Sequence, residues 1–170
     1  MIERPADADD LELLPLRVGI ALAPELDRFA ATRISLKWPN DLYVGGGKLA
    51  GVLTEARWRG ERLEWIAIGA GINVRAPEGE NAAGLSADAR RVDVLDVVVR
   101  AIRSAASRRG ALSDAERSSF AMRDRAVGRE CVEPVAGRVC GIDPGGALLV
   151  AVGSGVVAVR AGSLVLKEEQ

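Results

Sequence analysis

Histidine is absent from this 170-residue sequence, and cysteine occurs only twice, at Cys131 and Cys140. The absence of histidine excludes a histidine general base, a serine–histidine–carboxylate triad and imidazole metal ligands. The two cysteines have no second pair to complete a zinc site, so we expect both to be small, buried apolar side chains and expect no protein-held metal. Any chemistry must therefore use carboxylates, lysine, arginine, amides or the backbone.

Long hydrophobic runs and blocks of like charge are also missing. No apolar stretch approaches the ~20 residues needed to cross a bilayer, and the N-terminus is acidic, so we expect no membrane segment and no signal peptide, and we place the protein in the cytoplasm. The 23 Lys and Arg residues nearly balance 24 Asp and Glu residues, which argues against nucleic acid as a primary partner. With 48% apolar residues, the composition is typical of a globular protein.

Hydrophobic spacing predicts a helix followed by strands in the first half of the chain. Apolar residues recur every three or four positions between Leu11 and Phe29, which predicts a helix that Pro24 ends or kinks near Ala23. Three strands are expected, over residues 33–37, 48–55 and 64–72. The third is apolar almost throughout, which is typical of a central strand. A loop is expected after it.

Two more helices and a group of short strands are predicted in the second half. Helical spacing covers residues 92–109, and Ser113 with Glu116 forms a capping box that opens a helix toward Arg125. After Gly128, valine-rich runs alternate with glycine-rich turns, a pattern that predicts a small antiparallel barrel. We therefore expect two domains, residues 1–127 and 128–170.

Most of the polar information lies in the segment LKWPNDLYVGGGKLAGVLTE, residues 36–55. Pro39 pushes the residue before it into an extended conformation, which projects Asn40 and Asp41 at the end of a strand. An ordinary turn capped by these two residues is the alternative. Lys48 opens an apolar strand, where its ammonium group suits a carboxylate or phosphate ligand. The alternative is a surface lysine whose stem lies along apolar surface.

A second stretch, GAGIN at residues 69–73, follows a strand. Val74 stands where a dinucleotide-binding fingerprint needs its third glycine, so we exclude a Rossmann site. What remains is bare backbone at Gly69 and Gly71 beside the amide of Asn73, which can pair with an adenine edge. Close packing against a helix would explain the glycines equally well.

These motifs resemble the biotin protein ligases, which attach biotin to a lysine of a carrier protein. The resemblance rests on KWPNDLYVGGGKLAGVLTE, IAIGAGINV, LPLRVGIALA and GRVCGIDPGGALLVAVGSGVVAVRAGSLVL, and it covers nearly the whole chain in order. It implies an α+β fold: a class II synthetase-like core, with a mixed sheet packed by helices, in residues 1–127, and a small SH3-like β-barrel in residues 128–170.

The resemblance also implies an ATP-dependent ligase that forms biotinyl-5'-AMP from biotin and ATP with Mg²⁺, then transfers biotin to a lysine of a biotin carboxyl carrier protein. Lys48 would contact the biotin carboxylate and the adenylate phosphate, and Asp41 would orient the incoming lysine or the phosphoryl group. Arg17 and Lys37 are expected to have structural roles. The other implied binding residues are Trp38, Asn40, Gly51, Gly69, Gly71 and Asn73.

One part of the family pattern is not found: an upstream loop alternating glycine and arginine, with a segment that reads the ureido ring of biotin. We therefore expect a fragment, a gene product started at an internal methionine, or a truncated homologue whose exposed sheet edge seeks a second copy. The alternative function is a non-catalytic nucleotide- or carrier-binding module. A lipoate-type ligase is disfavoured because the Trp-Pro-Asn-Asp sequence belongs to the biotin branch. The winged-helix domain of the repressor-type members of the family is not found in this sequence either, so the resemblance does not imply regulation through DNA binding.

Overall fold

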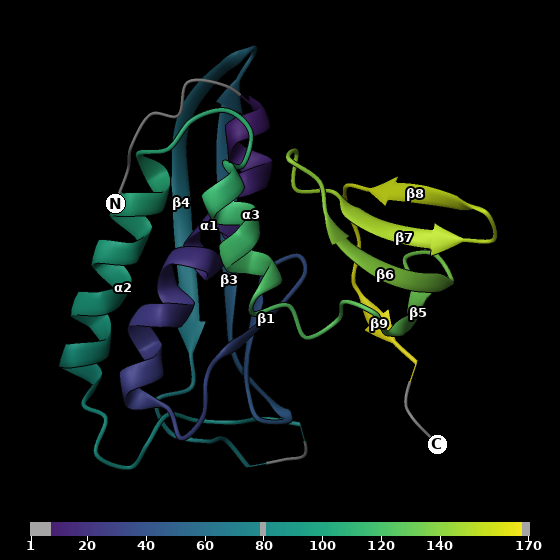
Figure 1. Cartoon of the computed structure of the whole chain (residues 1–170). Coiled ribbons are helices and arrows are strands. Elements are labelled where there is room, and N and C mark those ends of the chain that lie inside the picture. Colours follow the sequence, from purple (N-terminus) through teal and green to yellow (C-terminus); the bar gives the residue numbers. More distant parts are fainter. Residues whose placement is uncertain (1–7, 79–80, 168–170) are drawn as a thin grey trace.

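The computed structural model describes residues 8–78 and 81–167, which form helices and two antiparallel sheets (Figure 1). The helices are α1 (Ala8–Leu26), the 3₁₀ helix η1 (Asp27–Phe29), α2 (Arg91–Ala106) and α3 (Asp114–Ala121). The first sheet contains β1 (Ser35–Lys37), β2 (Asp41–Val44), β3 (Gly47–Arg59) and β4 (Arg62–Ile72). The second contains β5 (Glu130–Glu133), β6 (Gly137–Ile142), β7 (Leu148–Val152), β8 (Gly155–Val159) and β9 (Val165–Leu166). Figure 1 shows the α-helices gathered along the first sheet, with the second sheet beside them.

Helix α1 contains both Pro15 and Pro24. It does not end near Ala23 but continues to Leu26. The side chains of Leu22, Ala23 and Leu26 are fully buried, so the packing of this last turn outweighs the backbone hydrogen bond that Pro24 removes. Within the described ranges, no helix is both long and apolar enough to span a membrane.

The first sheet has the order β1-β2-β3-β4, and all its strand pairs are antiparallel. The expected mixed sheet is therefore wrong for the described strands, because the short connections between them join antiparallel neighbours. Parallel pairing is limited to two isolated bridges, Leu36 to Asp124 and Lys48 to Ala82. In the described part of the chain, β4 pairs with β3 alone, so it is an edge strand. Its apolar composition predicted a central position, but Ile66 is the one buried residue among those of β4, so composition alone did not fix the place of this strand in the sheet.

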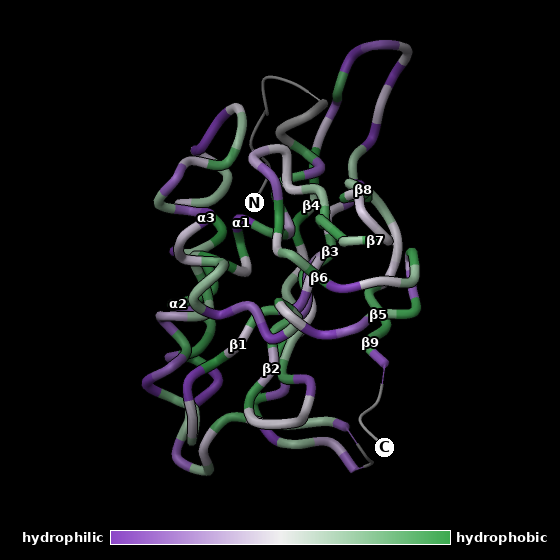
Figure 2. The backbone as a smooth tube through the Cα atoms, turned by 45° about the vertical axis from the view of Figure 1, so that its right-hand side comes forward, coloured by the Kyte–Doolittle hydropathy of each residue, from purple (hydrophilic) through white to green (hydrophobic). Residues whose placement is uncertain are grey.

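Helix α1 covers one face of this sheet, which we call the inner face; the opposite one is the outer face. A Cβ at Gly19 would lie 3.6 Å from Leu36 and 3.8 Å from Leu42, so the missing side chain lets the helix approach the strands closely. Helix α2 packs against α1. Figure 2 shows hydrophobic segments gathered along the helices and strands, whereas the outer loops are more hydrophilic. The residues buried on the inner face are Leu36, Leu42, Leu49, Ala50, Val52 and Ile66.

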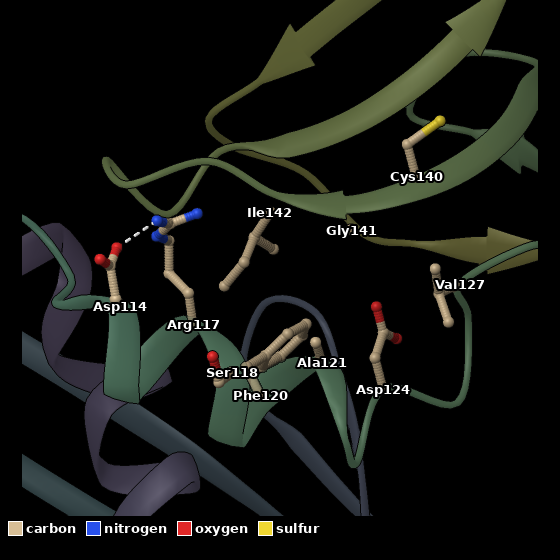
Figure 3. A pocket seen from close by; sticks show the side chains of 10 residues that line it. All are labelled: Asp114, Arg117, Ser118, Phe120, Ala121, Asp124, Val127, Cys140, Gly141 and Ile142. Carbon is tan, nitrogen blue, oxygen red and sulfur yellow. Dashed lines mark hydrogen bonds and ion pairs between the residues drawn. The ribbon is translucent and has the colours of Figure 1, made fainter.

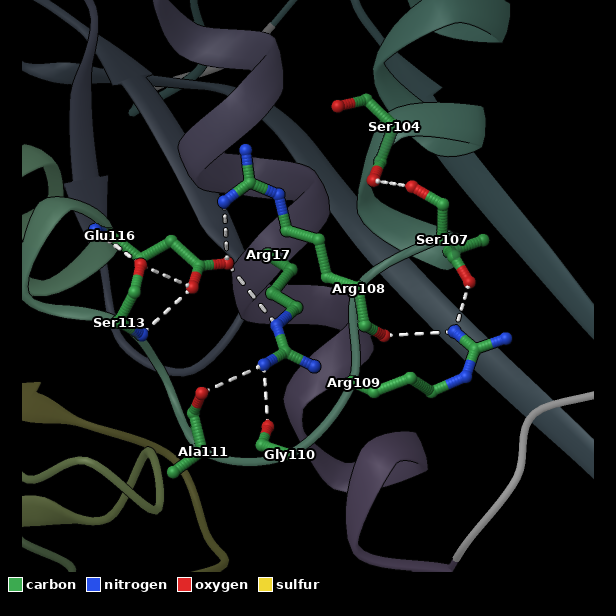
Figure 4. Close-up of polar contacts among 10 residues, drawn as sticks. Arg17, Ser104, Ser107, Arg108, Arg109, Gly110, Ala111, Ser113 and Glu116 are labelled. Atoms are coloured by element: carbon green, nitrogen blue, oxygen red, sulfur yellow. Dashed lines mark hydrogen bonds and ion pairs between the residues drawn. The ribbon is translucent and has the colours of Figure 1, made fainter.

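A buried ion pair joins α1 to α3 (Figure 4). Arg17, which is 2% exposed, donates through Nε to Glu116 Oε1 at 3.2 Å and through Nη2 to the carbonyl groups of Gly110 and Ala111. Glu116 also closes the predicted capping box with Ser113. Burial alone would raise the pKa of the Glu116 carboxyl, but the hydrogen bonds from Ser113 and the neighbouring arginine charges lower it. Arg17 thus has the structural role expected from the sequence.

The second sheet has the order β8-β7-β6-β5-β9. The predicted valine-rich strands form, and Val139, Leu148 and Val150 are buried between them and the rest of the core. Pairing among the described residues does not close this sheet into a barrel, so the SH3-like barrel stays a prediction. Cys131 is buried, but Cys140 is exposed. The expected burial of Cys140 is wrong because neighbouring positions on a strand project to opposite faces, and Val139 takes the inward one.

Candidate functional site

Four residues on neighbouring strands form a row across the first sheet. The register pairs Lys37 with Asp41, Asp41 with Gly51, and Gly51 with Gly71. Directly opposed residues of antiparallel strands project to the same face, so these four positions share the outer face. The row therefore joins the first polar motif to the GAGIN motif, which are far apart in the sequence.

A β-bulge brings Lys48 to the same face. Lys48 stands three positions before the β3 glycine of this row, and in a regular strand the two would project to opposite faces. The observed register pairs Tyr43 with Lys48 and Leu42 with Ala50. Leu49 is the extra residue, and both Leu49 and Ala50 are buried in the core. The bulge thus leaves Lys48 on the outer face.

The ammonium group of Lys48 is held over the row by a carboxylate. Lys48 Nζ lies 2.6 Å from Asp41 Oδ1, and the two side chains are 47% and 17% exposed. A Cβ on Gly51 would lie 3.3 Å from this Oδ1 and 3.7 Å from this Nζ, so the missing side chain leaves room for the pair. The ammonium group faces the glycine row, and about half of the lysine side chain is open to a ligand.

Three glycines make a bare surface beside this ion pair, and we call Gly51, Gly69 and Gly71 the glycine ledge. Gly69 joins the same face because it pairs with Leu53, two positions after Gly51. A Cβ on Gly69 or Gly71 would come no closer than 4.0 Å to a carbonyl oxygen. Among the described residues nothing packs closely on these two glycines, so close packing against a helix does not explain them. The ledge offers a flat surface to a planar group.

The backbone of Lys48 is fixed from two sides. Its carbonyl oxygen accepts hydrogen bonds from Asn73 Nδ2 at 3.2 Å and from the Ala83 N–H at 2.9 Å, and its N–H donates to the Asn81 carbonyl at 2.8 Å. The Asn73 N–H also donates to the Leu49 carbonyl at 2.9 Å. The structure therefore places Asn73 next to the site, where it positions the strand that carries Lys48. No sequence pattern predicted the contribution of residues 81–83.

Two other predicted site residues stabilise the scaffold. Asn40 donates through Nδ2 to the Val52 carbonyl at 2.8 Å and accepts the Val52 N–H at 3.0 Å, which ties its segment to β3. Trp38 is 2% exposed, and its indole N–H donates to the Gly146 carbonyl at 2.9 Å, in the turn between β6 and β7. Because almost none of the Trp38 side chain is exposed, it offers no surface to a ligand. The structure therefore does not bring Trp38 to the ledge.

Sequence reasoning missed Tyr43 and Arg125, which lie near Lys37, at the end of the row opposite Gly71. Tyr43 lies on the outer face, and the guanidinium carbon of Arg125 is 3.9 Å from its ring centroid. Lys37 Nζ lies 5.8 Å from the same centroid. Burial lowers the pKa of Lys37 most, and Arg125 and Lys48 lower it further, against the opposing effect of Asp41. No local pattern predicts Arg125, because long-range backbone contacts bring its segment to β1.

A second hollow, of about 370 Å³, lies between α3 and β6 (Figure 3). Asp124 and Cys140 line it, and Arg117 points toward Asp114 at its other end. Burial raises the pKa of Asp124, against the lowering effect of hydrogen bonds from the backbone of Ala126 and the following residue. None of the predicted site residues lines this hollow, so the outer face of the first sheet is the candidate site.

The donor set of this face suits a metal only together with a ligand. The described ranges contain no group of three or more Cys, Asp or Glu side chains that could hold a metal ion. Asp41 is a single carboxylate and is already paired with Lys48. Mg²⁺ commonly binds one or two protein carboxylates together with substrate phosphates. Asp41 therefore fits a Mg²⁺ ion that arrives on a phosphate chain.

Comparison with known proteins connects this face to one family. Residues 2–73, which include the row, match the model of the Biotin/lipoate A/B protein ligase family. The bifunctional ligase/repressor BirA of Escherichia coli (strain K12) is 43% identical over 70 residues, which cover 41% of this chain and 21% of that protein. The biotin--[acetyl-CoA-carboxylase] ligase of Paracoccus denitrificans is 39% identical over 57 residues, which cover 34% of this chain and 21% of that protein. The matched segment thus spans about a fifth of the length of these relatives.

Solved structures agree in fold. The biotin protein ligase from Aquifex aeolicus in complex with biotin and ATP superposes with a TM-score of 0.76 at 24% identity, over 99% of this chain and 77% of that chain. The apo structure of the same ligase gives a TM-score of 0.78 at 22% identity, over 98% of this chain and 80% of that chain. Sequence and fold together confirm the predicted resemblance: residues 2–73 match the Biotin/lipoate A/B protein ligase family, and a biotin ligase is among the relatives that the chain resembles.

Proposed function

We propose that the chain is an ATP-dependent biotin protein ligase, which forms biotinyl-5'-AMP and transfers biotin to a lysine of a biotin carboxyl carrier protein in the cytoplasm. The observation that carries the proposal is the Lys48 ammonium group, held by Asp41 over the glycine ledge on the outer face. This arrangement offers a positive charge beside a flat surface, which are the two features that an acyl-adenylate requires.

In the first step, a biotin carboxylate oxygen attacks the α-phosphorus of ATP, the bond from that phosphorus to the bridging oxygen breaks, and pyrophosphate leaves. Negative charge accumulates at the phosphorus as the two anions meet. Lys48 lowers the free energy of this state because its ammonium group is fixed beside the ledge by the pair with Asp41. Asp41 would be the protein carboxylate that holds a Mg²⁺ ion bound to the phosphates of ATP, and the ion would offset part of their negative charge.

In the second step, the amine of the carrier lysine attacks the acyl carbon, the bond to the phosphate oxygen breaks, and AMP and a proton leave. An anionic adenylate competes with Asp41 for the Lys48 ammonium group. The released Asp41 carboxylate then accepts a hydrogen bond from an N–H of the incoming amine and orients its lone pair toward the acyl carbon. Asn73 and Asn40 keep β3 and the preceding segment in register, and Gly51, Gly69 and Gly71 leave room for the adenylate.

The proposal also covers the domain organisation and the oligomeric state. Residues 1–127 would form the catalytic core and residues 128–170 a module of SH3-like type. The free edge of β4 would pair with a further strand, either from the same protein or from a second copy in a homo-oligomer. Measurement of the molecular mass in solution tests the second possibility.

The proposal is tested by replacing Lys48 with alanine. We expect the Lys48→Ala variant to lose biotin-dependent exchange of labelled pyrophosphate into ATP by at least about 100-fold, since one charged group at a transition state contributes roughly this much. The matched control is Lys167→Ala, another of the three lysines, which lies exposed beyond β9. Equal exchange by Lys48→Ala and wild type would remove Lys48 from the chemistry.

Calorimetry separates the ligase from the alternative, a nucleotide- or carrier-binding module without turnover. A ligase gives heat with biotin and with ATP and then forms biotinyl-5'-AMP. Heat with ATP or the carrier, none with biotin and no adenylate formation would favour the module.

A further inference from the structure

Three cations gather on the outer face around Tyr43 and Asp41. Lys48 is paired with Asp41, and Lys37 is the partner of Asp41 across β1 and β2. Arg125 reaches the same place from the segment after α3, with its guanidinium group stacked on the Tyr43 ring at 3.9 Å. We call Lys37, Arg125 and Tyr43 the basic end of the row.

Backbone contacts explain why Arg125 is there. The Leu36 N–H donates to the Arg123 carbonyl at 2.7 Å, and the Arg125 N–H donates to the Leu36 carbonyl at 3.0 Å. Residues 123–125 therefore run along β1 like an additional parallel strand. Because neighbouring residues of an extended segment project to opposite faces, Asp124 lies on the inner face of the sheet and Arg125 on its outer face.

The charges at the basic end do not balance. Lys48 is paired with Asp41, and Lys37 lies in the field of this one carboxylate and of three cations, Arg125, Lys48 and Arg129. Arg123, by contrast, has its own carboxylate partner on η1. Cations held this close repel one another unless an anion joins them.

Arg125 also carries an unused donor. Its Nη1 is buried and has no hydrogen-bond partner in the described part of the chain. A buried donor without an acceptor is costly. A guanidinium group that stacks on an aromatic ring keeps the N–H groups of its edge available for a phosphate oxygen. An anion with several oxygens would supply this acceptor and would also offset the neighbouring positive charges.

We propose that Lys37 and Arg125 bind the outer phosphates of ATP and hold the pyrophosphate group as it leaves. The proposal rests on the proposed function and assigns a further part of the same site. Neighbouring strands lie about 4.8 Å apart, so the two steps from Gly51 to Lys37 span roughly 10 Å. A single phosphate does not cover this distance, but a nucleotide whose base lies on the ledge extends a chain of three phosphates past Asp41 to the basic end.

Pyrophosphate itself is the probe. We expect calorimetric titration of the 170-residue chain to show pyrophosphate binding that Arg125→Gln and Lys37→Gln each weaken by about tenfold or more. The control is Arg62→Gln, an exposed arginine at the far end of β4 that removes the same charge. Circular dichroism checks the fold, because the backbone hydrogen bonds of Arg125 do not depend on its side chain.

The outcomes separate this proposal from the proposed function. Equal pyrophosphate affinity of Arg125→Gln and wild type overturns the proposal, whether or not the chain makes adenylate. Pyrophosphate binding that depends on Arg125 supports it even where no biotinyl-5'-AMP forms. A glutamate-rich peptide is titrated in parallel: binding of the peptide that depends on Arg125, without binding of pyrophosphate, overturns the proposal in favour of a surface that docks an acidic protein segment.

Discussion

Replacement of Gly71 by valine separates the stability of the sheet from the use of the ledge. A Cβ at this position would meet only the Gly51 carbonyl oxygen, at 4.0 Å, and the backbone of Gly71 is not in the left-handed region. Glycine in a strand is less favourable than a residue with a side chain by about 0.5–1 kcal/mol. We therefore expect Gly71→Val to increase the free energy of unfolding by this amount and Tm by about 1–4 °C for a domain of this size.

The same substitution should impair ligand binding. The new side chain stands on the ledge beside Gly51, where the proposed adenylate lies, so a planar group is lifted from the sheet and away from Lys48. We expect ATP affinity to fall by about tenfold or more, because contact over the ring face is lost. The matched control is Gly155→Val in β8, where a Cβ would lie 3.9 Å from the Val152 carbonyl oxygen and which belongs to the second sheet.

Thermal melting and calorimetric titration with ATP are carried out on the wild type, Gly71→Val and Gly155→Val. The expected pattern is increased stability in both variants, with loss of ATP affinity only in Gly71→Val. Undiminished ATP binding by Gly71→Val would refute the ledge as a ligand surface. A marked decrease in its Tm would refute the description of an open outer face at this position.

Two further predictions concern carboxylates that pair with arginines. Glu116→Gln leaves the Arg17 guanidinium buried without its carboxylate, so we expect urea denaturation to show a loss of about 3 kcal/mol; a loss below about 1 kcal/mol, the level of an exposed pair, would contradict this. Burial acts to raise the pKa of Asp27, but hydrogen bonds from Arg123 and from the backbone of Ile34 lower it overall. A depressed folded-state pKa stabilises the protein above the unfolded value of about 3.9 and loses this effect as the pH falls through the folded value. Asp27→Asn should therefore reduce stability at pH 7 but not at pH 2, and an equal deficit at both would refute the charge argument.

Local patterns predicted the helices and strands because they depend on residues near in sequence. The three- and four-residue spacing around Val18 and Leu22, the capping box of Ser113 and the valine-rich strands all describe contacts within one element or its immediate neighbours. The continuation of α1 past Pro24 was not predictable in this way. It depends on burial against the sheet, which outweighs local preference.

The candidate site was predicted in its residues but only partly in its geometry. The motifs singled out Lys48 and Asp41, and the structure brings their side chains together. Trp38 was misplaced because its burial depends on the second sheet, more than 100 positions away. Arg125 was missed for the same reason, since its stacking on Tyr43 follows from pairing between β1 and a distant segment.

The bulge at Leu49 has a consequence for any attempt to transplant this site. Because the bulge adds one residue to β3, Lys48 and Gly51 are an odd number of positions apart and still project to the same face. Copied onto a regular strand, the same odd spacing would drive the ammonium group into an apolar interior. A design would have to shorten the spacing between the lysine and the glycine by one residue or copy the bulge as well. Whether that spacing is odd or even therefore matters as much as the identity of the two residues.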